Sequence, residues 1–183
     1  MRREDLALEG PCLIVLDLFG DERGSFVETY SARKLAALGI EDDFILDARS
    51  VNRNAGTLRG LHFQIPPHAQ AKLVRVNRGH MLDIIVDLRK ASSDFGRHLA
   101  IELSGDDARL LYVPAGFAHG FCTLSNDVEV VYKLSRDHSP DHERGVLWSD
   151  PALGIDWPVE PEDATLSERD RKFPTLAELP EYF

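Results

Sequence analysis

The chain has 183 residues, of which 43% are apolar and 28% are charged, a composition typical of globular proteins. Thirty-one acidic residues against 21 basic ones give a formal net charge of −10, which disfavours binding to nucleic acid or to an anionic membrane. An anionic ligand would therefore be bound by a few arginines and lysines in a recessed site. No apolar run approaches the roughly 20 residues that span a bilayer. The charged N-terminus does not resemble a signal peptide, so we expect a cytoplasmic protein.

The chain has only two cysteines, Cys12 and Cys122, both in mostly apolar surroundings. This number excludes a disulfide scaffold but leaves a single disulfide open. The favoured interpretation is two reduced thiols that pack as small hydrophobic side chains in a reducing compartment.

The first part of the chain predicts two short strands and a helix. Apolar residues 13–16 form the first strand, and residues 20–24, with a glycine at each end, form a turn. A second strand follows over residues 25–30. A helix is expected over residues 32–38, because the serine before it is a suitable N-cap and the glycine after it favours termination.

Residues 58–134 carry a dense pattern of strands separated by turns. Polar and apolar residues alternate in 72–76, in 82–88 and in 127–134, which is the period of a strand with two different faces. In the last of these strands Tyr132 shares its face with valines and a leucine, so we expect its ring to point into the space that the sheet encloses. Many short strands of this kind favour a sandwich or a barrel.

Six prolines interrupt the chain after about residue 137, and residues 167–170 fit a capping box that opens a helical turn. We expect residues 1–183 to form one domain. Its N-terminal strands and short helix lie in 1–57, its barrel core in 58–136, and a tail that wraps the core in 137–183.

The segment Leu58-Arg59-Gly60-Leu61-His62-Phe63-Gln64 is the first candidate for chemistry. Strand alternation places Gly60, His62 and Gln64 on one face and Arg59 on the other. A histidine among small and polar neighbours is well placed for proton transfer. The alternative is a histidine that is simply hydrogen-bonded within a sheet.

The second candidate is His119, at the end of Pro114-Ala115-Gly116-Phe117-Ala118-His119. The alternative role of His119 is to satisfy backbone carbonyl groups in a turn. This Pro-x-Gly-x-x-His spacing resembles the second half of the cupin signature, whose metal-binding form also needs His-x-His and a glutamate. Here the first half offers only a lone histidine, and one or two imidazoles without a carboxylate are too few for a stable transition-metal site. The pattern therefore predicts a cupin barrel without a metal.

Three further side chains could act in such a barrel, and each has an ordinary structural alternative. Lys72 facing inward is costly unless it meets an anion or a developing negative charge, whereas facing outward it is simply solvated. Tyr132 is either a core tyrosine or an acid that faces His62 across a flat substrate. Asp170 either caps a turn with Ser167 or accepts a hydrogen bond from His62.

Taken together and in this order, the motifs resemble one family over about residues 10–176. They are Asp21-x-Arg23-Gly24-x-Phe26-x-Glu28, Leu58 to Gln64, Gln70 to Val74, Asp83 to Arg89, Pro114 to Phe121, Tyr132-Lys133, Trp148-x-Asp150-Pro151, Ile155-x-Trp157-Pro158 and Leu166-Ser167-x-x-Asp170. The family is that of the dTDP-4-dehydrorhamnose 3,5-epimerases. No single motif is specific, but the combination is.

The resemblance implies an all-β, cupin-type jelly-roll barrel with a few short peripheral helices and without metal or cofactor. It implies a homodimer whose N-terminal strand packs across the subunit interface. The implied reaction converts dTDP-4-dehydro-6-deoxy-D-glucose to dTDP-4-dehydro-L-rhamnose by epimerisation at C3 and C5, on the route to dTDP-L-rhamnose and surface polysaccharide.

The resemblance also implies a role for each matched residue. The catalytic residues would be His62 as general base, Asp170 as its partner, Tyr132 as general acid and Lys72 as the ligand of the C4 oxygen. The substrate-binding residues would be Arg23, Phe26, Glu28, Arg59, Gln64 and His119, with the two arginines at the diphosphate and Phe26 and Glu28 around the nucleotide. The chemistry is coherent, because the protons at C3 and C5 are both α to the C4 ketone and a buried lysine can stabilise the enolate.

The chain departs from the family pattern at Leu46 and Ala48, where the family usually has Gln and Asn, and at His138, where Tyr is common. These positions leave the exact nucleotide and sugar open. The alternatives are an epimerase acting at C3 alone or on another nucleotide-linked 4-keto sugar, a binding barrel without activity, and a metal-dependent cupin oxygenase. The retained acid–base pair argues against the binding barrel, and the missing ligands argue against the oxygenase.

Overall fold

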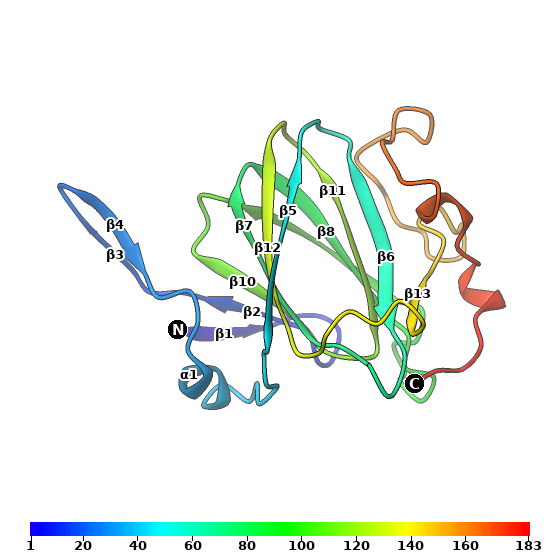
Figure 1. Cartoon of the computed structure of the whole chain (residues 1–183), viewed down its shortest axis with the longest axis horizontal. Coiled ribbons are helices and arrows are strands. Elements are labelled where there is room, and N and C mark those ends of the chain that lie inside the picture. The colour runs from blue at the N-terminus through cyan, green and yellow to red at the C-terminus, as the bar shows by residue number, and fades with distance from the viewer.

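Two antiparallel sheets face each other in the computed structural model, which describes all 183 residues (Figure 1). The larger sheet consists, in spatial order, of β1 (Arg2–Asp5), β2 (Cys12–Val15), β10 (Arg109–Val113), β7 (Lys72–Arg78), β12 (Val128–Leu134) and β5 (Leu46–Asn52). The smaller sheet consists of β13 (Glu143–Gly145), β6 (Leu58–Gln64), β11 (Phe117–Thr123), β8 (His80–Asp87) and β9 (His98–Ser104). The predicted all-β jelly-roll architecture is confirmed.

The main hydrophobic core lies between the two sheets. Val74, Val76 and Val130 contribute from the larger sheet, and Ile85 and Phe121 from the smaller one. These residues occupy alternate positions of their strands, because side chains at every second residue point to the same face. The ring of Tyr132 packs against this core, so the predicted inward orientation of Tyr132 is confirmed.

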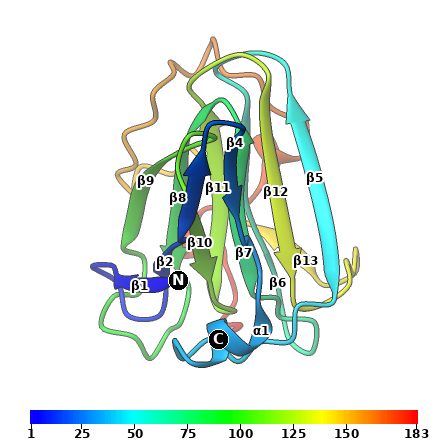
Figure 2. The ribbon, with the colours of Figure 1, turned by 90° about the vertical axis from the view of Figure 1, so that its left-hand side faces the viewer.

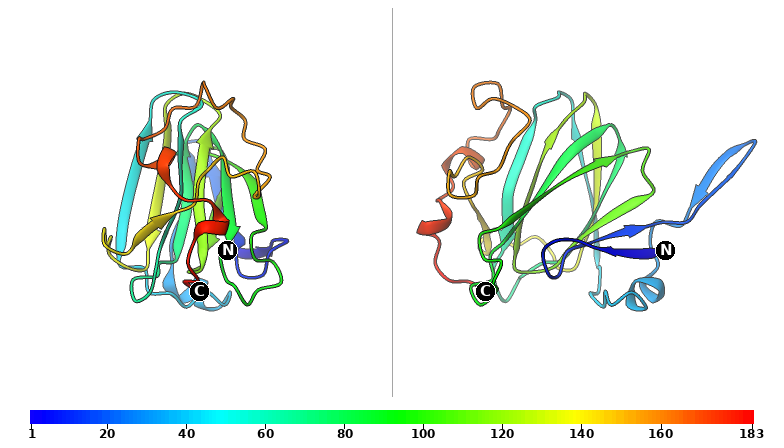
Figure 3. Two further views of the ribbon diagram at one scale, coloured as in Figure 1. Left: turned by 90° about the vertical axis from the view of Figure 1, so that its right-hand side faces the viewer. Right: turned by 180° about the vertical axis from the view of Figure 1, so that it is seen from behind.

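The outer face of the smaller sheet is covered by the C-terminal part of the chain. Figure 3 shows the C-terminal part of the chain, coloured orange to red, running along this side of the molecule. Ile84 and Val86 on β8 form a second apolar cluster with Val146 and Leu153, which follow β13. Two short 3-10 helices, η1 (Asp170–Lys172) and η2 (Leu176–Glu178), lie in this part of the chain. Strand β8 is therefore buried on both faces, and its two acidic side chains, Asp83 and Asp87, are both fully buried.

The N-terminal segment forms a hairpin that projects from the body of the molecule (Figures 1 and 2). Its strands are β3 (Leu18–Asp21) and β4 (Gly24–Val27), which pair only with each other. Helix α1 (Ala32–Ala36) follows and packs on the outer face of the larger sheet. The predicted helix is confirmed but shorter, with the hydroxyl of Ser31 accepting from the amide of Lys34 at 3.4 Å.

Strand β1 was not expected, because its four residues are all charged and give no apolar pattern. It forms at the edge of the larger sheet by pairing with β2. Cys12 and Cys122 are both buried and free, in agreement with the favoured interpretation. No helix has the length and the apolar character needed to cross a membrane.

Candidate active site

A cavity of about 340 Å³ opens between the two sheets. The side chains that line it include Arg59, His62, Lys72, His119 and Tyr132, all of which the sequence analysis singled out. They come from both sheets, since β6 and β11 belong to the smaller sheet and β7 and β12 to the larger one. The cavity thus brings together these five residues, which lie up to 73 positions apart in the sequence.

The centre of the site is a pair formed by His62 and Asp170. Nε2 of His62 lies 2.8 Å from Oδ1 of Asp170, while Oδ2 of Asp170 accepts from the amide of Gly60 at 3.2 Å. Burial raises the pKa of Asp170, but its contacts with His62 and Gly60 outweigh burial and hold that pKa below its ordinary value. The carboxylate is therefore an acceptor. A neutral His62 then carries its proton on Nε2 and keeps Nδ1 free to take a proton.

The local turn and one aromatic ring fix this pair in place. The amide of Asp170 donates to the hydroxyl of Ser167 at 3.1 Å, which leaves the carboxylate free to face His62. The ring of Phe173 lies edge-on to His62, with 5.6 Å between centroids. A Cβ on Gly145, which pairs with His62 in the sheet, would lie within 2.4 Å of that ring, so only glycine fits. Of the two roles considered for Asp170, this geometry supports the hydrogen bond with His62.

Lys72 lies in the cavity with its ammonium group beside the same histidine. Nζ donates to the backbone oxygen of His62 at 3.3 Å. Burial lowers the pKa of Lys72 to about 8, although the negative charges of Asp83 and Glu143 act in the opposite direction. A partly desolvated ammonium group of this kind is suited to stabilise negative charge that develops on a bound oxygen.

The hydroxyl of Tyr132 belongs to a short polar chain that ends at Arg59. It lies 3.4 Å from the hydroxyl of Ser50, to which the amide of Asn52 donates at 3.3 Å. Nε of Arg59 donates to Oδ1 of Asn52 at 2.7 Å. Burial raises the pKa of Tyr132, so its hydroxyl stays protonated and can act as a proton donor.

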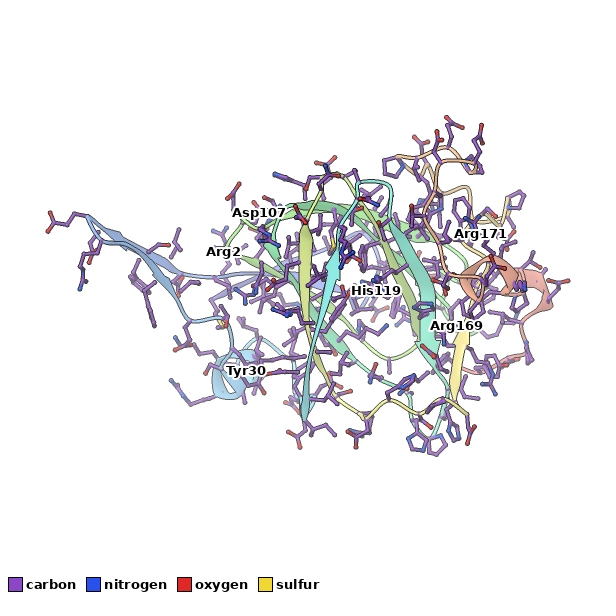
Figure 4. All side chains as sticks on the ribbon, turned by 45° about the horizontal axis from the view of Figure 1, so that its top comes forward. Arg2, Tyr30, Asp107, His119, Arg169 and Arg171 are labelled. Atoms are coloured by element: carbon purple, nitrogen blue, oxygen red, sulfur yellow. The ribbon has the colours of Figure 1, made fainter.

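His119 is held by a second buried carboxylate. Its Nε2 lies 2.9 Å from Oδ2 of Asp83, and both side chains are almost completely inaccessible. Figure 4 shows His119 between the two sheets. The sequence analysis named His119 as a candidate, whereas Asp83 appeared only within an alternating strand and a family motif.

Arg59 and His62 line the same cavity, whereas simple alternation predicted opposite faces for Arg59 and His62. The prediction was wrong because alternation breaks at Gly60, whose φ of +115° favours glycine, and because the pairing of β6 with β11 shifts register nearby. No larger residue fits at Gly60, since a Cβ there would lie 2.6 Å from Gly120.

Four of the predicted binding residues lie outside the lining of this cavity. The side chain of Gln64 donates to the backbone oxygens of His68 and Asp137 and accepts from the amide of Ser139. It therefore joins the loops at the rim. The other three residues, Arg23, Phe26 and Glu28, lie on or beside the projecting hairpin, where Arg23 pairs with Asp21 at 2.5 Å and Glu28 pairs with Lys34 at 2.9 Å.

The structure adds Glu143 and Arg169, which the sequence analysis did not select. Glu143 lines the cavity and pairs with Arg169 at 2.5 Å and with His138 at 3.2 Å. A neighbouring cavity of about 480 Å³ is lined by Arg59, His62, Arg169 and Asp170. No sequence motif marked Arg169, although its position directly before Asp170 could have done so.

All three departures from the family pattern line the main cavity. Leu46 and Ala48 project from β5, and His138 lies at the rim. The edge of the cavity at β5 is consequently apolar, while β6, β7 and β11 supply charged and polar groups. No cluster of three or more His, Cys, Asp or Glu side chains is placed to hold a metal ion.

Comparisons with known proteins agree on one family. The model of the dTDP-4-dehydrorhamnose 3,5-epimerase family matches residues 5–178. A dTDP-4-dehydrorhamnose 3,5-epimerase from Methanothermobacter thermautotrophicus is 42% identical over 177 residues, which are 96% of this chain and 95% of that protein.

Two solved structures have the same fold. A dTDP-4-dehydrorhamnose 3,5-epimerase from Bacillus anthracis, with TDP and PPi bound, has a TM-score of 0.92 at 45% identity and covers 95% of this chain and 98% of its own. An epimerase from Legionella pneumophila, in complex with dTDP-4-keto-L-rhamnose, has a TM-score of 0.92 at 36% identity, with coverage of 98% and 94%. The chain belongs to the dTDP-4-dehydrorhamnose 3,5-epimerase family.

Proposed function

We propose that this protein inverts C3 and C5 of dTDP-4-dehydro-6-deoxy-D-glucose and so produces dTDP-4-dehydro-L-rhamnose. The observation that carries the proposal is that His62, Lys72 and Tyr132 line one cavity while Asp170 contacts His62. A base, its supporting carboxylate, a cation and a protonated hydroxyl are the groups that such an epimerisation needs. The apolar edge at β5 suits the deoxygenated C6 of the sugar.

His62 acts as the general base. Its free Nδ1 takes a proton from the carbon next to the C4 ketone, and the C–H electron pair becomes the double bond of an enolate. Nε2–H keeps its hydrogen bond to Asp170, whose negative charge stabilises the imidazolium that forms. The proton thus moves to His62, and the negative charge moves to the C4 oxygen.

Lys72 stabilises that charge. Its ammonium group is already desolvated and held beside His62 before the reaction begins, so little reorganisation is needed when the enolate forms. Removing one such preorganised donor typically costs about 2.7–4 kcal/mol of transition-state stabilisation. Because the pKa of Lys72 is about 8, its ammonium form predominates at neutral pH.

Tyr132 completes the inversion from the opposite side. It reaches the cavity from β12 of the larger sheet, whereas His62 reaches it from β6 of the smaller one. A proton delivered by Tyr132 to the enolate carbon therefore arrives on the face opposite to the one that His62 deprotonated. We propose that Arg59 and Arg169, which line the second cavity, bind the substrate diphosphate.

Solvent isotope exchange tests the reaction directly. With dTDP-4-dehydro-6-deoxy-D-glucose in deuterated water, we expect deuterium at both C3 and C5, because each inverted carbon receives its new proton from a solvent-exchangeable group. Proton NMR of the product measures this. Deuterium at C3 alone would instead assign the protein as a 3-epimerase, and a panel of other nucleotide-linked 4-keto sugars would then identify its substrate.

We further infer that the active protein is a homodimer in which each hairpin completes the site of the other subunit. Phe19 and Phe26 on the hairpin are 63% and 69% exposed, which is unusual for large apolar side chains on a free surface. Of the residues implied in substrate binding, Phe26 lies on β4, Arg23 lies in the turn between β3 and β4, and Glu28 directly follows β4. They therefore belong to the hairpin that projects from the body of the molecule, or lie directly beside it (Figure 1). The free thiols and the nucleotide-sugar substrate favour the cytoplasm as the location.

Mixing two inactive variants tests this arrangement. One variant carries Arg23→Ala and Phe26→Ala in the hairpin, and the other carries His62→Asn. After subunit exchange, a mixed dimer has one site with both His62 and an intact hairpin. Random association gives half mixed dimers with one complete site each, so we expect activity to recover to about a quarter of the unmodified value.

The matched control mixes His62→Asn with Tyr132→Phe. Both side chains act in the cavity of the same chain, so every site in the mixed dimer lacks one of them and activity should stay low. Absence of recovery in the first mixture, with subunit exchange verified by mass spectrometry, would show that the hairpin acts on its own subunit or not at all.

A further inference from the structure

Two polar side chains of β5, those of Ser50 and Asn52, connect groups that the proposed reaction uses. Ser50 contacts the hydroxyl of Tyr132 at one end of this hydrogen-bond chain, and Asn52 contacts Arg59 at the other. Strand alternation places both on the same face as Ala48, which lines the main cavity. Asn52 is only 2% exposed, so its amide group needs partners within the protein. The proposed reaction uses the two ends of the hydrogen-bond chain but gives no role to its middle.

The partners of Asn52 determine which way its amide group points. The oxygen of a side-chain amide only accepts hydrogen bonds, and the nitrogen only donates them. A guanidinium group can only donate, so Oδ1 lies toward Nε of Arg59, at 2.7 Å. A backbone carbonyl can only accept, so Nδ2 donates to the oxygen of Val128 at 3.2 Å. The second hydrogen of Nδ2 is therefore left for Ser50, whose Oγ accepts it at 3.3 Å.

The hydroxyl of Ser50 continues this direction toward Tyr132. Its oxygen lies within hydrogen-bond distance of two side-chain groups, the amide nitrogen of Asn52 and the hydroxyl of Tyr132. The amide nitrogen cannot accept, so of these two only the oxygen of Tyr132, at 3.4 Å, can take the hydrogen of Ser50. If Tyr132 donated instead, the hydrogen of Ser50 would lose that acceptor. Donation from Ser50 to Tyr132 thus gives every donor from Arg59 to Ser50 an acceptor.

We propose that Ser50 and Asn52 are positioning residues, which direct the proton of Tyr132 into the cavity and stabilise the tyrosinate that remains when this proton is transferred. Because Oη accepts from Ser50, the hydrogen of Tyr132 is free to point to the enolate carbon. The inference rests on the proposed function in taking Tyr132 as the acid. The direction of the hydrogen-bond chain is a property of the free protein.

The hydrogen bond from Ser50 is strongest when it is needed. During the transfer the O–H bond of Tyr132 breaks and its electron pair stays on Oη, while the enolate double bond supplies the pair for the new C–H bond and the C4 carbonyl forms again. The hydrogen bond then meets a negative charge, and hydrogen bonds to charged groups are the stronger ones. Burial raises the pKa of Tyr132, and the contact with Ser50 acts in the opposite direction. Ser50 therefore offsets part of the cost of a buried tyrosinate.

Ser50→Ala removes the donor to Tyr132 and leaves His62 and Lys72 in place. In deuterated water the enolate should still form, so deuterium should still enter the substrate at nearly the native rate. Inversion should fall about tenfold relative to exchange, because a hydrogen bond to a charged oxygen is lost. Proton NMR measures both rates in one sample. Equal losses of exchange and inversion would indicate a merely structural role, and an unchanged ratio would indicate none, so either result overturns the proposal.

Two further variants test the direction of the hydrogen-bond chain. Ser50→Thr keeps a hydroxyl and should retain the native ratio of inversion to exchange. Asn52→Asp replaces the donor to Ser50 by a carboxylate, which can only accept. The hydrogen of Ser50 then turns to position 52 and Tyr132 donates to Ser50, so inversion should fall about tenfold although Ser50 is present. A native ratio in Asn52→Asp would overturn the inferred direction, also if Ser50→Ala does not fold.

Thr123→Val is the matched control. Thr123 is 2% exposed, and its hydroxyl accepts from the amide of Thr57 at 2.9 Å and donates to the backbone oxygen of Asn54 at 2.8 Å. Neither partner belongs to the hydrogen-bond chain behind Tyr132. The change removes a buried hydroxyl, so it lowers stability but should leave the ratio of inversion to exchange native. A fall as large as in Ser50→Ala would overturn the proposal, since loss of stability alone would then explain it.

A titration without substrate separates this inference from the proposed reaction. With 3,5-difluorotyrosine at position 132, the ring hydroxyl is far more acidic than in tyrosine, and 19F NMR follows its ionisation. In Ser50→Ala the midpoint should lie about one pH unit higher, because the ionised form loses its donor. An unchanged midpoint would overturn the inferred hydrogen bond. A raised midpoint in a protein that catalyses no exchange would support the hydrogen-bond chain and reject only the proposed function.

Discussion

Substituting His62 by asparagine is expected to lower kcat by roughly 10²–10⁴-fold, the usual contribution of a general base. Asparagine has no group that can take a proton from carbon at neutral pH. Its amide can still donate to Asp170, which His62 contacts at 2.8 Å, so the carboxylate keeps a partner and the fold should survive. Steady-state kinetics and calorimetric binding of dTDP measure the two effects separately, and binding should change little.

Asp170→Asn provides a graded comparison with that variant. It leaves the base in place but removes the charge that supports the imidazolium, so its loss of kcat should be smaller than that of His62→Asn. If Asp170 served only the local turn, the change would alter stability by about 1 kcal/mol and leave the chemistry intact. Near-native turnover of His62→Asn would contradict the assignment of the base, whatever the result at Asp170.

The orientation of most catalytic side chains could be predicted from the sequence, because it depends on the two-residue period of a strand. Tyr132 faces the cavity as alternation predicted, and Lys72 takes the inward one of its two alternatives. Arg59 does not follow the rule, since the backbone of Gly60 changes the face between Arg59 and His62. Periodicity cannot reveal such a break. The contact between His62 and Asp170, which are 108 residues apart, was one of two alternatives for Asp170, and only the resemblance to a family favoured it.

Asp83 shows a second limit of strand alternation, which cannot predict whether a polar face is buried. An acid that alternates with apolar residues usually indicates a face in water. In this protein β8 lies inside its sheet, the C-terminal part of the chain covers one face, and the other faces the larger sheet. The polar side of the strand is therefore buried, and Asp83 contacts His119 there. Burial on both faces depends on elements distant in sequence, so the local pattern could not indicate it.

Tyr132→Phe is expected to separate proton removal from inversion. The variant keeps the ring, which packs against the core between the sheets, and loses only the hydroxyl that lies 3.4 Å from Ser50. His62 and Lys72 remain, so the enolate should still form. Without an acid on the opposite side, His62 returns a proton to the face from which it came. In deuterated water the substrate should then gain deuterium while little epimer appears.

If Tyr132 is only a core residue and not the acid, different effects on stability and on turnover are expected. As a core tyrosine it would contribute at most one hydrogen bond, so the phenylalanine variant would lose about 1 kcal/mol of stability and keep nearly all of its turnover. Measuring exchange and inversion in one NMR experiment, with thermal unfolding alongside, distinguishes the two roles. Exchange without inversion identifies the hydroxyl as the acid. Inversion at the native rate would mean that water or another group in the cavity delivers the proton, because a phenyl ring has none to give.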